Sequence, residues 1–334
     1  MAGSQSHMAN SSTLRHLLRS FDGTVHLPGE AGYDELRRPL NPALDPRLAL
    51  VAQPTSPREV QAAVIAARQD GLPIAVQATG HGLHRSYDGG LLLNTAAMST
   101  VLVDPDRRVA RVGPGATWGQ VLAAAAPFGL APLSGSSPSV GVTGFTLGGG
   151  VGWLSRLHGF AADSVIRAEV VTASGQRITA GPDQHADLFW ALRGGGGGLG
   201  LVTALEFRLH PVARVYAGTS YFSAERAAET LAVYRDWVED APDELSTAIL
   251  LTRDAVGIRL MHAGERAEAE RLIEPLRAAA GPALEDGFGE APYATVAIGG
   301  TAPRHLDLFE RLSDDVIDFL VEATADDGLG ISTI

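Results

Sequence analysis

The sequence predicts an α+β protein with two domains. Its 334 residues are enough for about two domains that each bury a core. Short helix and strand patterns alternate along the first part and are interrupted by long glycine runs. From Pro211 onward these runs stop, and longer strand and amphipathic helix patterns follow. We therefore place a domain boundary near Pro211 and expect an antiparallel sheet backed by helices beyond it.

Capping boxes mark the starts of two helices in the first half. Ser56-Pro57-Arg58-Glu59 is a capping box with proline at the first helical position, and it predicts a helix up to Gly71. Thr117-Trp118-Gly119-Gln120 is a second one, before a helix up to Phe128. Residues 25–46 show little periodicity. Strands are expected at 72–76, 91–94, 101–104 and 108–112.

A second glycine run lies between a helix and a strand. We expect a hairpin of strands at 163–174 and 177–179, a helix at 186–192 and a strand at 201–209. Within the run, Gly195, Gly197 and Gly200 match the pattern GxGxxG. A dinucleotide fingerprint follows a strand and opens a helix, whereas the order here is reversed. A nicotinamide-binding Rossmann domain is therefore disfavoured.

The second half alternates strands and helices. Strands are expected at 215–222, 245–251 and 257–261, and helices at 224–239 and 265–279. At the ends of the chain, MAGSQSHM resembles an expression leader, and residues 12–20 suggest a short amphipathic helix. The final residues, 330–334, stop inside a strand pattern. We therefore expect that native C-terminal residues are missing.

Composition and charge exclude several kinds of chemistry. The net charge of -12 argues against a nucleic-acid partner, which would need a basic face. The sequence has no cysteine, which excludes thiol catalysis, disulfides and thiolate metal sites. It also has no lysine, which excludes a Schiff-base lysine and a P-loop lysine. No secretion signal or membrane span is recognisable, so we expect a cytoplasmic protein without a membrane partner, and we assign no metal ligand.

The glycine-rich stretch Ser134 to Leu154 is the strongest candidate for a binding site. This density of glycine favours neither a helix nor a strand. Where backbone N–H groups press against a flat ring or a pyrophosphate, a Cβ is an obstruction that glycine removes. A solvated surface loop is the alternative, and the interleaved apolar side chains disfavour it. Those side chains are Val140, Val142, Phe145, Leu147, Val151 and Trp153.

A histidine between two glycines follows the strand expected at 72–76. The segment Gln77-Ala78-Thr79-Gly80-His81-Gly82 displays His81 at the end of that strand. A lone histidine is most often structural or merely exposed, but this placement favours a site residue. His84 is a weaker candidate.

Several segments together resemble a known family. Pro54 to Val60, the turn Thr79-Gly80-His81-Gly82, Ser137 to Val165 and Asp187 to Pro211 are similar, in matching order, to motifs of the FAD-linked oxidases. The resemblance is to members with the vanillyl-alcohol-oxidase (PCMH) type FAD-binding domain, in the berberine-bridge-enzyme-like branch. It implies a leader and approach segment at 1–44, a two-subdomain FAD-binding domain at 45–211 and a substrate domain at 212–334.

The resemblance also implies how FAD is held. His81 would be joined covalently to the 8α-methyl carbon of FAD. Ser137 stands where doubly linked members carry a cysteine, so a single link is expected. Val140 stands where valine admits oxygen to the flavin, which favours an oxidase. The implied FAD-binding residues are His81, Ala78, Thr79, Gly80, Gly82, Ser134, Gly135, Ser137, Pro138, Val140, Gly141, Gly144, Gly148, Gly149, Gly150, Gly152, Trp153 and Val202.

The expected function is that of an FAD-dependent oxidase. It would take a hydride from a carbon bearing oxygen or nitrogen in a small molecule and return the electrons to oxygen. The alternatives are a flavin-dependent reductase with a nicotinamide electron donor and a non-enzymatic flavin-binding module. The Tyr-x-Asn-Tyr segment that often supplies the base in relatives is absent from this sequence. Tyr221, Tyr293 and His262 lie in the second half, but each is better explained as structure, so no catalytic residue is assigned.

Overall fold

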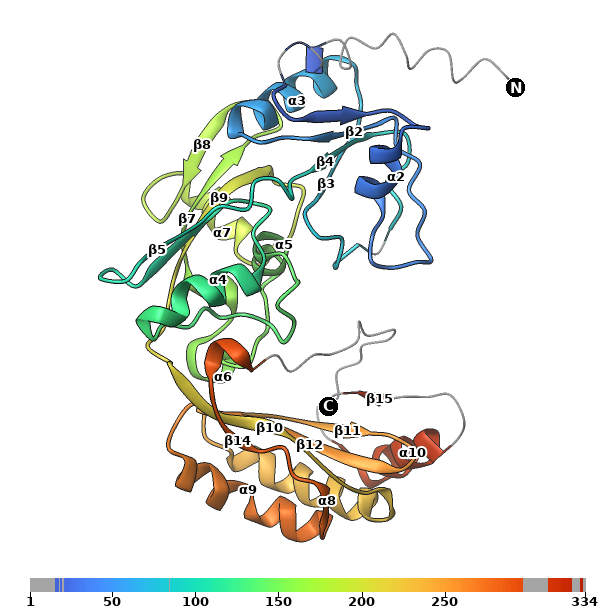
Figure 1. Ribbon diagram of the computed structural model, residues 1–334, viewed down its shortest axis with the longest axis vertical. Helices are drawn as coiled ribbons and strands as arrows, with labels where there is room; N and C mark the ends of the chain where they lie inside the picture. The colour runs from blue at the N-terminus through green and yellow to red at the C-terminus, as the bar shows by residue number, and fades with distance from the viewer. Residues whose placement is uncertain are drawn as a thin grey trace. The chain divides into compact units, whose positions relative to one another are not determined.

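The chain forms two compact units in the computed structural model, which describes residues 16–17, 19, 21–83, 85–296, 312–325 and 331–332 (Figure 1). The first unit comprises the described residues up to Gly152 together with Phe160–His210. The second comprises Trp153–Gly159 and the described residues from Pro211 onward. Of the helix expected at 12–20 only three positions are described, and these are helical. The leader at 1–8 and His84 lie outside the described residues.

The first sheet of the first unit places the ends of two parallel strands together. It consists of β1 (Thr24–His26), β2 (Leu50–Gln53), β3 (Ile74–Gln77) and β4 (Leu91–Asn94), in the order β1-β2-β4-β3. Strand β1 is antiparallel to β2, whereas β2 and β3 both run parallel to β4. Gln77 and Asn94, the last residues of β3 and β4, are register partners. The loop that carries His81 therefore begins at the carboxyl edge of this sheet.

Helix α3 (Pro57–Gln69) begins at the predicted capping box. The Ser56 hydroxyl accepts from the Glu59 backbone N–H, and the Glu59 carboxylate accepts from the Ser56 N–H. The same carboxylate accepts the backbone N–H groups of Gly23 at 2.8 Å and Thr55 at 2.6 Å. The predicted capping box is confirmed, and it also ties the chain before β1 to this helix.

Helix α2 (Ala31–Arg37) lies in the region where the sequence showed little periodicity. The Tyr33 hydroxyl donates to the carbonyl of Leu48 at 2.7 Å. The buried Arg37 forms ion pairs with Asp34 at 2.7 Å and with Asp45. Contacts beyond the helix itself therefore hold it, and a local pattern could not predict them.

The second sheet of the first unit is antiparallel throughout. Its strands, in spatial order, are β5 (Val101–Asp104), β6 (Val109–Val112), β9 (Leu201–Arg208), β7 (Val165–Val171) and β8 (Arg177–Ala180). Helices α4 (Trp118–Ala125) and α7 (Ala186–Leu192) and the 3-10 turn η2 (Ala126–Phe128) also form where expected. Because α7 precedes the five-glycine run and β9 follows it, the GxGxxG match is confirmed as spurious.

The glycine-rich stretch is not free of helix. It contains α5 (Val142–Leu147), and α6 (Ser155–His158) and the 3-10 turn η3 (Ala161–Ser164) follow it. The expectation that the glycine density favours no helix here was wrong for α5. Gly141 and Gly148 lie at the two ends of this helix and only Gly144 lies inside it. Most of the glycines thus avoid the entropic cost of the helical interior.

The second unit is an antiparallel sheet backed by helices, as predicted. Its strands are β10 (Arg214–Ser223), β11 (Leu245–Leu251), β12 (Ala255–His262), β13 (Ala283–Glu285), β14 (Gly289–Pro292) and β15 (Ile331–Ser332). Its helices are α8 (Ala227–Trp237), α9 (Arg266–Ala280) and α10 (Asp314–Ala325), with 3-10 turns η4 (Ala224–Arg226), η5 (Val238–Asp240) and η6 (Tyr293–Thr295). The main order is β13-β10-β12-β11-β15, and β14 also pairs with β10. The sequence did not predict β13, β14 or α10.

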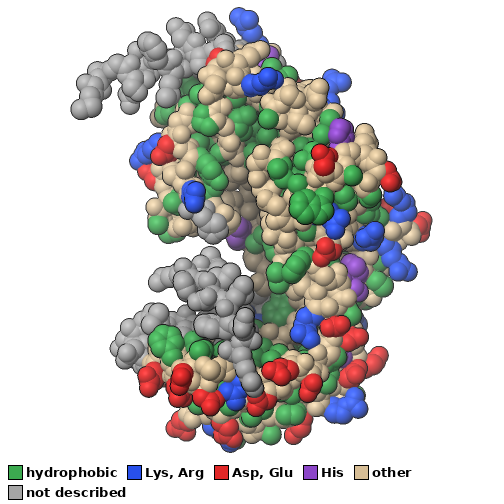
Figure 2. Space-filling model, turned by 180° about the vertical axis from the view of Figure 1, so that it is seen from behind, with side chains coloured by type: hydrophobic (Ala, Val, Ile, Leu, Met, Phe, Trp, Pro, Cys, Tyr) green, Lys and Arg blue, Asp and Glu red, His purple; other side chains and the backbone are tan. Residues whose placement is uncertain are grey.

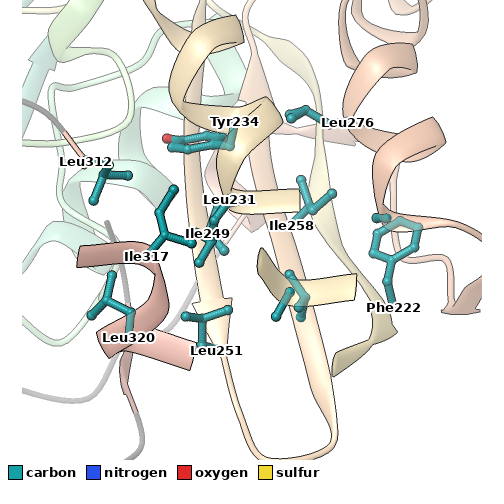
Figure 3. Close-up of a cluster of buried hydrophobic side chains, with 13 residues drawn as sticks. Phe222, Leu231, Tyr234, Ile249, Leu251, Ile258, Leu276, Leu312, Ile317 and Leu320 are labelled. Atoms are coloured by element: carbon teal, nitrogen blue, oxygen red, sulfur yellow. The ribbon is translucent and has the colours of Figure 1, made fainter. Parts of the chain in front are cut away.

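Helices and sheet of the second unit pack together through a cluster of buried hydrophobic side chains (Figure 3). Ile249 and Ile258 are register partners on β11 and β12, and both are almost fully buried. Around them lie Phe222, Leu231, Tyr234, Leu251, Leu276, Leu312, Ile317 and Leu320. The helices α8, α9 and α10 therefore cover one face of the sheet.

Acidic side chains gather on the surface of the second unit (Figure 2). Those exposed on α8 and α9 include Glu229, Asp236, Glu268, Glu270 and Glu274. These helices thus place apolar residues in the core and charged residues in solvent. In the part of the chain that the structure describes, no helix combines the length and apolar character that crossing a membrane requires.

Candidate cofactor-binding site

The loop after β3 is fixed just before His81. It carries Ala78, Thr79, Gly80, His81 and Gly82. The Gln77 side-chain amide donates to the carbonyls of Leu36 at 3.3 Å and Arg38 at 3.2 Å. Gly80 has a φ of 75°, and its carbonyl accepts the Leu40 N–H at 3.3 Å. This left-handed conformation favours glycine and turns the chain immediately before His81.

The His81 side chain contacts the second candidate segment. Its Nε2 lies 2.9 Å from the hydroxyl oxygen of Ser139. That oxygen lies 3.0 Å from the hydroxyl oxygen of Ser137. Burial lowers the pKa of the half-buried His81 imidazole below its ordinary value. The ring is therefore mainly neutral at pH 7, with one nitrogen carrying a lone pair.

The segment with Ser137 and Ser139 is anchored to the start of α4. The Trp118 N–H donates to the carbonyl of Val140 at 3.0 Å, and the Gly119 N–H donates to the carbonyl of Pro138 at 2.8 Å. These N–H groups have no partner within the helix, so the segment satisfies them. A Cβ built on Gly141 would lie 3.4 Å from the Thr79 hydroxyl oxygen. The first unit thus brings the two candidate segments side by side.

Internal packing accounts for three of the candidate glycines. A Cβ built on Gly135 would lie 2.9 Å from the ring of Phe145, and one built on Gly150 would lie 2.5 Å from the same ring. A Cβ on Gly152 would lie 2.1 Å from the carbonyl oxygen of Ser134. These glycines are needed by the fold whether or not a ligand is present.

Two other glycines have no such explanation. A Cβ built on Gly82 or Gly144 would meet no heavy atom within 4 Å, and neither residue has a left-handed backbone. Gly149 is equally open, but its φ of 101° itself favours glycine, and a Cβ on Gly148 would make only ordinary contacts. The absence of side chains at Gly82 and Gly144 leaves bare backbone beside His81 and on α5. This arrangement fits a flat, flavin-sized group that lies against the backbone.

The second glycine run forms hydrogen bonds to the last residue of α5. The N–H groups of Gly194 and Gly196 donate to the carbonyl of Leu147 at 3.2 Å and 2.8 Å. Before the run, the Arg193 side chain donates to the carbonyl of Ala162 at 3.1 Å and pairs with Asp163 at 3.6 Å. The two glycine-rich segments are therefore neighbours in the first unit, a contact that sequence reasoning did not predict.

Two predicted cofactor residues have contacts of another kind. Val202 is buried in β9 and pairs with Val170 of β7. Trp153 belongs to the second unit, where its carbonyl accepts from the Ser246 hydroxyl at 2.7 Å. Sequence reasoning also missed Ser139, although its position between Ser137 and Val140 was a usable signal.

The three side chains considered as possible bases all belong to the second unit. Tyr293 and His262 are buried in the second unit, and Tyr221 is half-buried with its ring over Gly257. Among the residues that the structure describes, no group of three or more histidine or acidic side chains could hold a metal ion. Neither observation identifies a base.

Comparison with known proteins identifies the first unit. Residues 48–181 match the family model of the FAD binding domain. The chain is 33% identical over 268 residues to (R)-6-hydroxynicotine oxidase of Paenarthrobacter nicotinovorans, which covers 77% of this chain and 58% of that protein. The chain spans about 60% of the length of the curated relatives it matches.

Solved structures agree with this match. Glucooligosaccharide oxidase of Acremonium strictum, which carries a 6-S-cysteinyl, 8α-N1-histidyl FAD, is 27% identical with a TM-score of 0.83, over 96% of this chain and 72% of its own. Physcomitrella patens BBE-like 1 shares the fold, with a TM-score of 0.84 at 23% identity, over 94% of this chain and 75% of its own. Residues 48–181 are therefore an FAD binding domain, and the chain is similar to the vanillyl-alcohol-oxidase (PCMH) type of FAD-linked oxidoreductases.

Proposed function

We propose that the chain is an FAD-dependent oxidase of small molecules. It would take a hydride from a carbon that bears oxygen or nitrogen. The chemistry that bound FAD supplies is acceptance of the hydride at N5 and return of the electrons to oxygen. The observation that carries the proposal is the contact between His81 and the Ser137 to Gly141 segment, beside the open backbone of Gly82 and Gly144.

His81 is the proposed covalent anchor of the cofactor. Its neutral imidazole is a nucleophile, and the neighbouring Gly80 and Gly82 leave its approach unhindered. Ser137 lies near it but cannot form a thioether, so one link is proposed rather than two. The remaining predicted residues would contact FAD mainly through their backbone. The FAD-binding roles of Val202 and Trp153 stay predictions.

We propose different binding roles for the two domains that the sequence predicts. Residues 45–211 would hold FAD, and residues 212–334 would bind the substrate. Val140 would admit oxygen to the flavin; its carbonyl is fixed by Trp118, which sets the position of its half-buried side chain. The relative (R)-6-hydroxynicotine oxidase supports an oxidase of small molecules. The cytoplasmic location expected from the sequence stays a prediction.

Acid precipitation tests the proposal. The purified chain, produced with FAD available, should keep its yellow colour in the acid pellet, and the His81→Ala variant should release it to the supernatant. Oxidase character is tested separately by reducing the bound flavin without air and then admitting oxygen. Rapid reoxidation with release of hydrogen peroxide is expected. Colour in the supernatant of both proteins would contradict the covalent link, and reoxidation too slow for turnover would contradict the oxidase.

A further inference from the structure

Three side chains form a hydrogen-bonded row to which the proposed function assigns no role as a group. The order is His81 Nε2, Ser139 Oγ and Ser137 Oγ, with separations of 2.9 Å and 3.0 Å. Ser139 stands between the other two, so its hydroxyl can accept from one neighbour and donate to the other. The three residues come from two segments, since His81 and Ser139 are 58 positions apart.

The donor and acceptor roles in these hydrogen bonds decide which imidazole nitrogen of His81 can react. A neutral imidazole has one N–H and one lone pair. If the Nε2 hydrogen is donated to Ser139, the lone pair is on Nδ1. If Ser139 donates to Nε2 instead, the lone pair is engaged and Nδ1 carries the hydrogen. Only the first arrangement leaves a free nucleophilic nitrogen.

The position of Ser139 is fixed independently of His81. The carbonyls of its neighbours Pro138 and Val140 accept the first N–H groups of α4 at 2.8 Å and 3.0 Å. The hydroxyl is therefore presented from a backbone held on both sides. A hydroxyl at this distance restricts the rotation of the ring, and it also sets the tautomer when it accepts from Nε2.

The geometry points to Ser139, supported by Ser137, as the positioning residue that holds His81 for the attachment of FAD. The 8α-N1-histidyl link of glucooligosaccharide oxidase supports Nδ1 as the nitrogen that is joined. This inference rests on the proposed function, because it assumes the covalent link. The attachment forms a bond between Nδ1 and the flavin 8α carbon. It breaks one C–H bond of the 8α methyl group and the Nε2–H bond. The two electrons pass to dioxygen, which leaves as hydrogen peroxide.

In this arrangement the Ser139 hydroxyl also helps to remove a proton from His81. Once Nδ1 is bonded to carbon, the ring must lose the hydrogen on Nε2 to become neutral. Ser139 Oγ lies within hydrogen-bond distance of that nitrogen, and Ser137 Oγ lies within hydrogen-bond distance of Ser139 Oγ. Removal of the Ser139 hydroxyl should therefore slow the attachment without weakening the binding of FAD that precedes it.

The test separates binding from attachment. Flavin-free chain is mixed with FAD in air; total bound flavin is measured by absorbance after gel filtration, and attached flavin by fluorescence of acid-precipitated samples over time. Ser139→Ala should bind as much FAD as the wild type but attach it roughly 100-fold more slowly, the scale of a lost proton acceptor. Ser139→Thr keeps the hydroxyl and should restore the rate.

Two further variants make the result specific. Ser136→Ala removes a hydroxyl from the same segment and should attach FAD at the wild-type rate. Ser137→Ala leaves Ser139 in place and should cause a smaller delay than Ser139→Ala. In the flavin peptide isolated from the wild type, NMR should show substitution at Nδ1 of His81.

The outcomes distinguish this inference from the function on which it rests. Attachment at the wild-type rate in Ser139→Ala, or substitution at Nε2, would overturn the role of Ser139 alone. A wild-type chain whose flavin is always released by acid would overturn the covalent link and this inference together. If Ser139→Ala does not fold, NMR of the wild-type flavin peptide still decides, because substitution at Nε2 would overturn the role of Ser139 and substitution at Nδ1 would support it.

Discussion

Replacing Gly144 by alanine distinguishes the effect of this glycine on folding stability from its effect on FAD binding. Gly144 lies inside α5, has no left-handed backbone, and offers open space where a Cβ would be. In the flavin-free chain, Gly144→Ala should therefore raise the free energy of unfolding by about 0.5–1 kcal/mol, the usual gain for alanine over glycine in a helix. If FAD lies against this backbone, the added methyl group should obstruct it, and the two effects have opposite signs.

The assay uses the His81→Ala background, in which binding of FAD is reversible. Urea unfolding without FAD gives the stability, and a fluorescence titration with FAD gives the affinity. We expect Gly144→Ala to lower the affinity at least tenfold, which corresponds to about 1.4 kcal/mol. Gly289→Ala is the matched control, because Gly289 in β14 of the second unit is equally open and has no left-handed backbone. Unchanged affinity in Gly144→Ala would refute the reasoning.

Three further predictions concern acid stability, the access of oxygen to the flavin and the hydrophobic core of the second unit. Burial raises the pKa of Glu59, but hydrogen bonds from Gly23 and Thr55 outweigh this and hold it below its ordinary value of 4.5. The carboxylate therefore stabilises the fold above pH 4.5, and this stability is lost as the pH falls through the lower folded pKa. Glu59→Gln should cost about 1–3 kcal/mol at pH 7 in urea unfolding and flatten the acid dependence; an unchanged pH profile would contradict this. Val140→Ile should slow reoxidation of the reduced flavin by oxygen in stopped-flow measurements, and equal rates would argue against an oxygen path at this residue. Ile249→Ala should lower the free energy of unfolding of the second unit by about 2–5 kcal/mol, while the FAD content stays unchanged; a loss of bound FAD would contradict the assignment of FAD binding to the first unit.

Elements with local signals could be predicted from the sequence. The capping box of α3 joins Ser56 to Glu59, three residues away, so its signal lies within a few adjacent letters. Helix α2 has no such signal. It is held by contacts such as Tyr33 with Leu48 and Arg37 with Asp45, which depend on how distant segments meet.

In the candidate site, too, a local signal could be predicted from the sequence, whereas contacts between distant segments could not. A histidine between glycines at the end of a strand was enough to single out His81. Its contact with Ser139 could not be predicted, because the two segments meet only in the folded first unit. Nor could the sequence separate Gly150, which Phe145 packing requires, from Gly144, where nothing within the chain excludes a side chain.

The most direct test of the account is whether the folded chain binds FAD. The full-length protein is mixed with excess FAD and passed through a gel-filtration column, and its flavin and protein absorbances are compared, with circular dichroism to verify folding. We expect one FAD for each chain. A chain that is correctly folded yet leaves the column colourless would contradict the central claim.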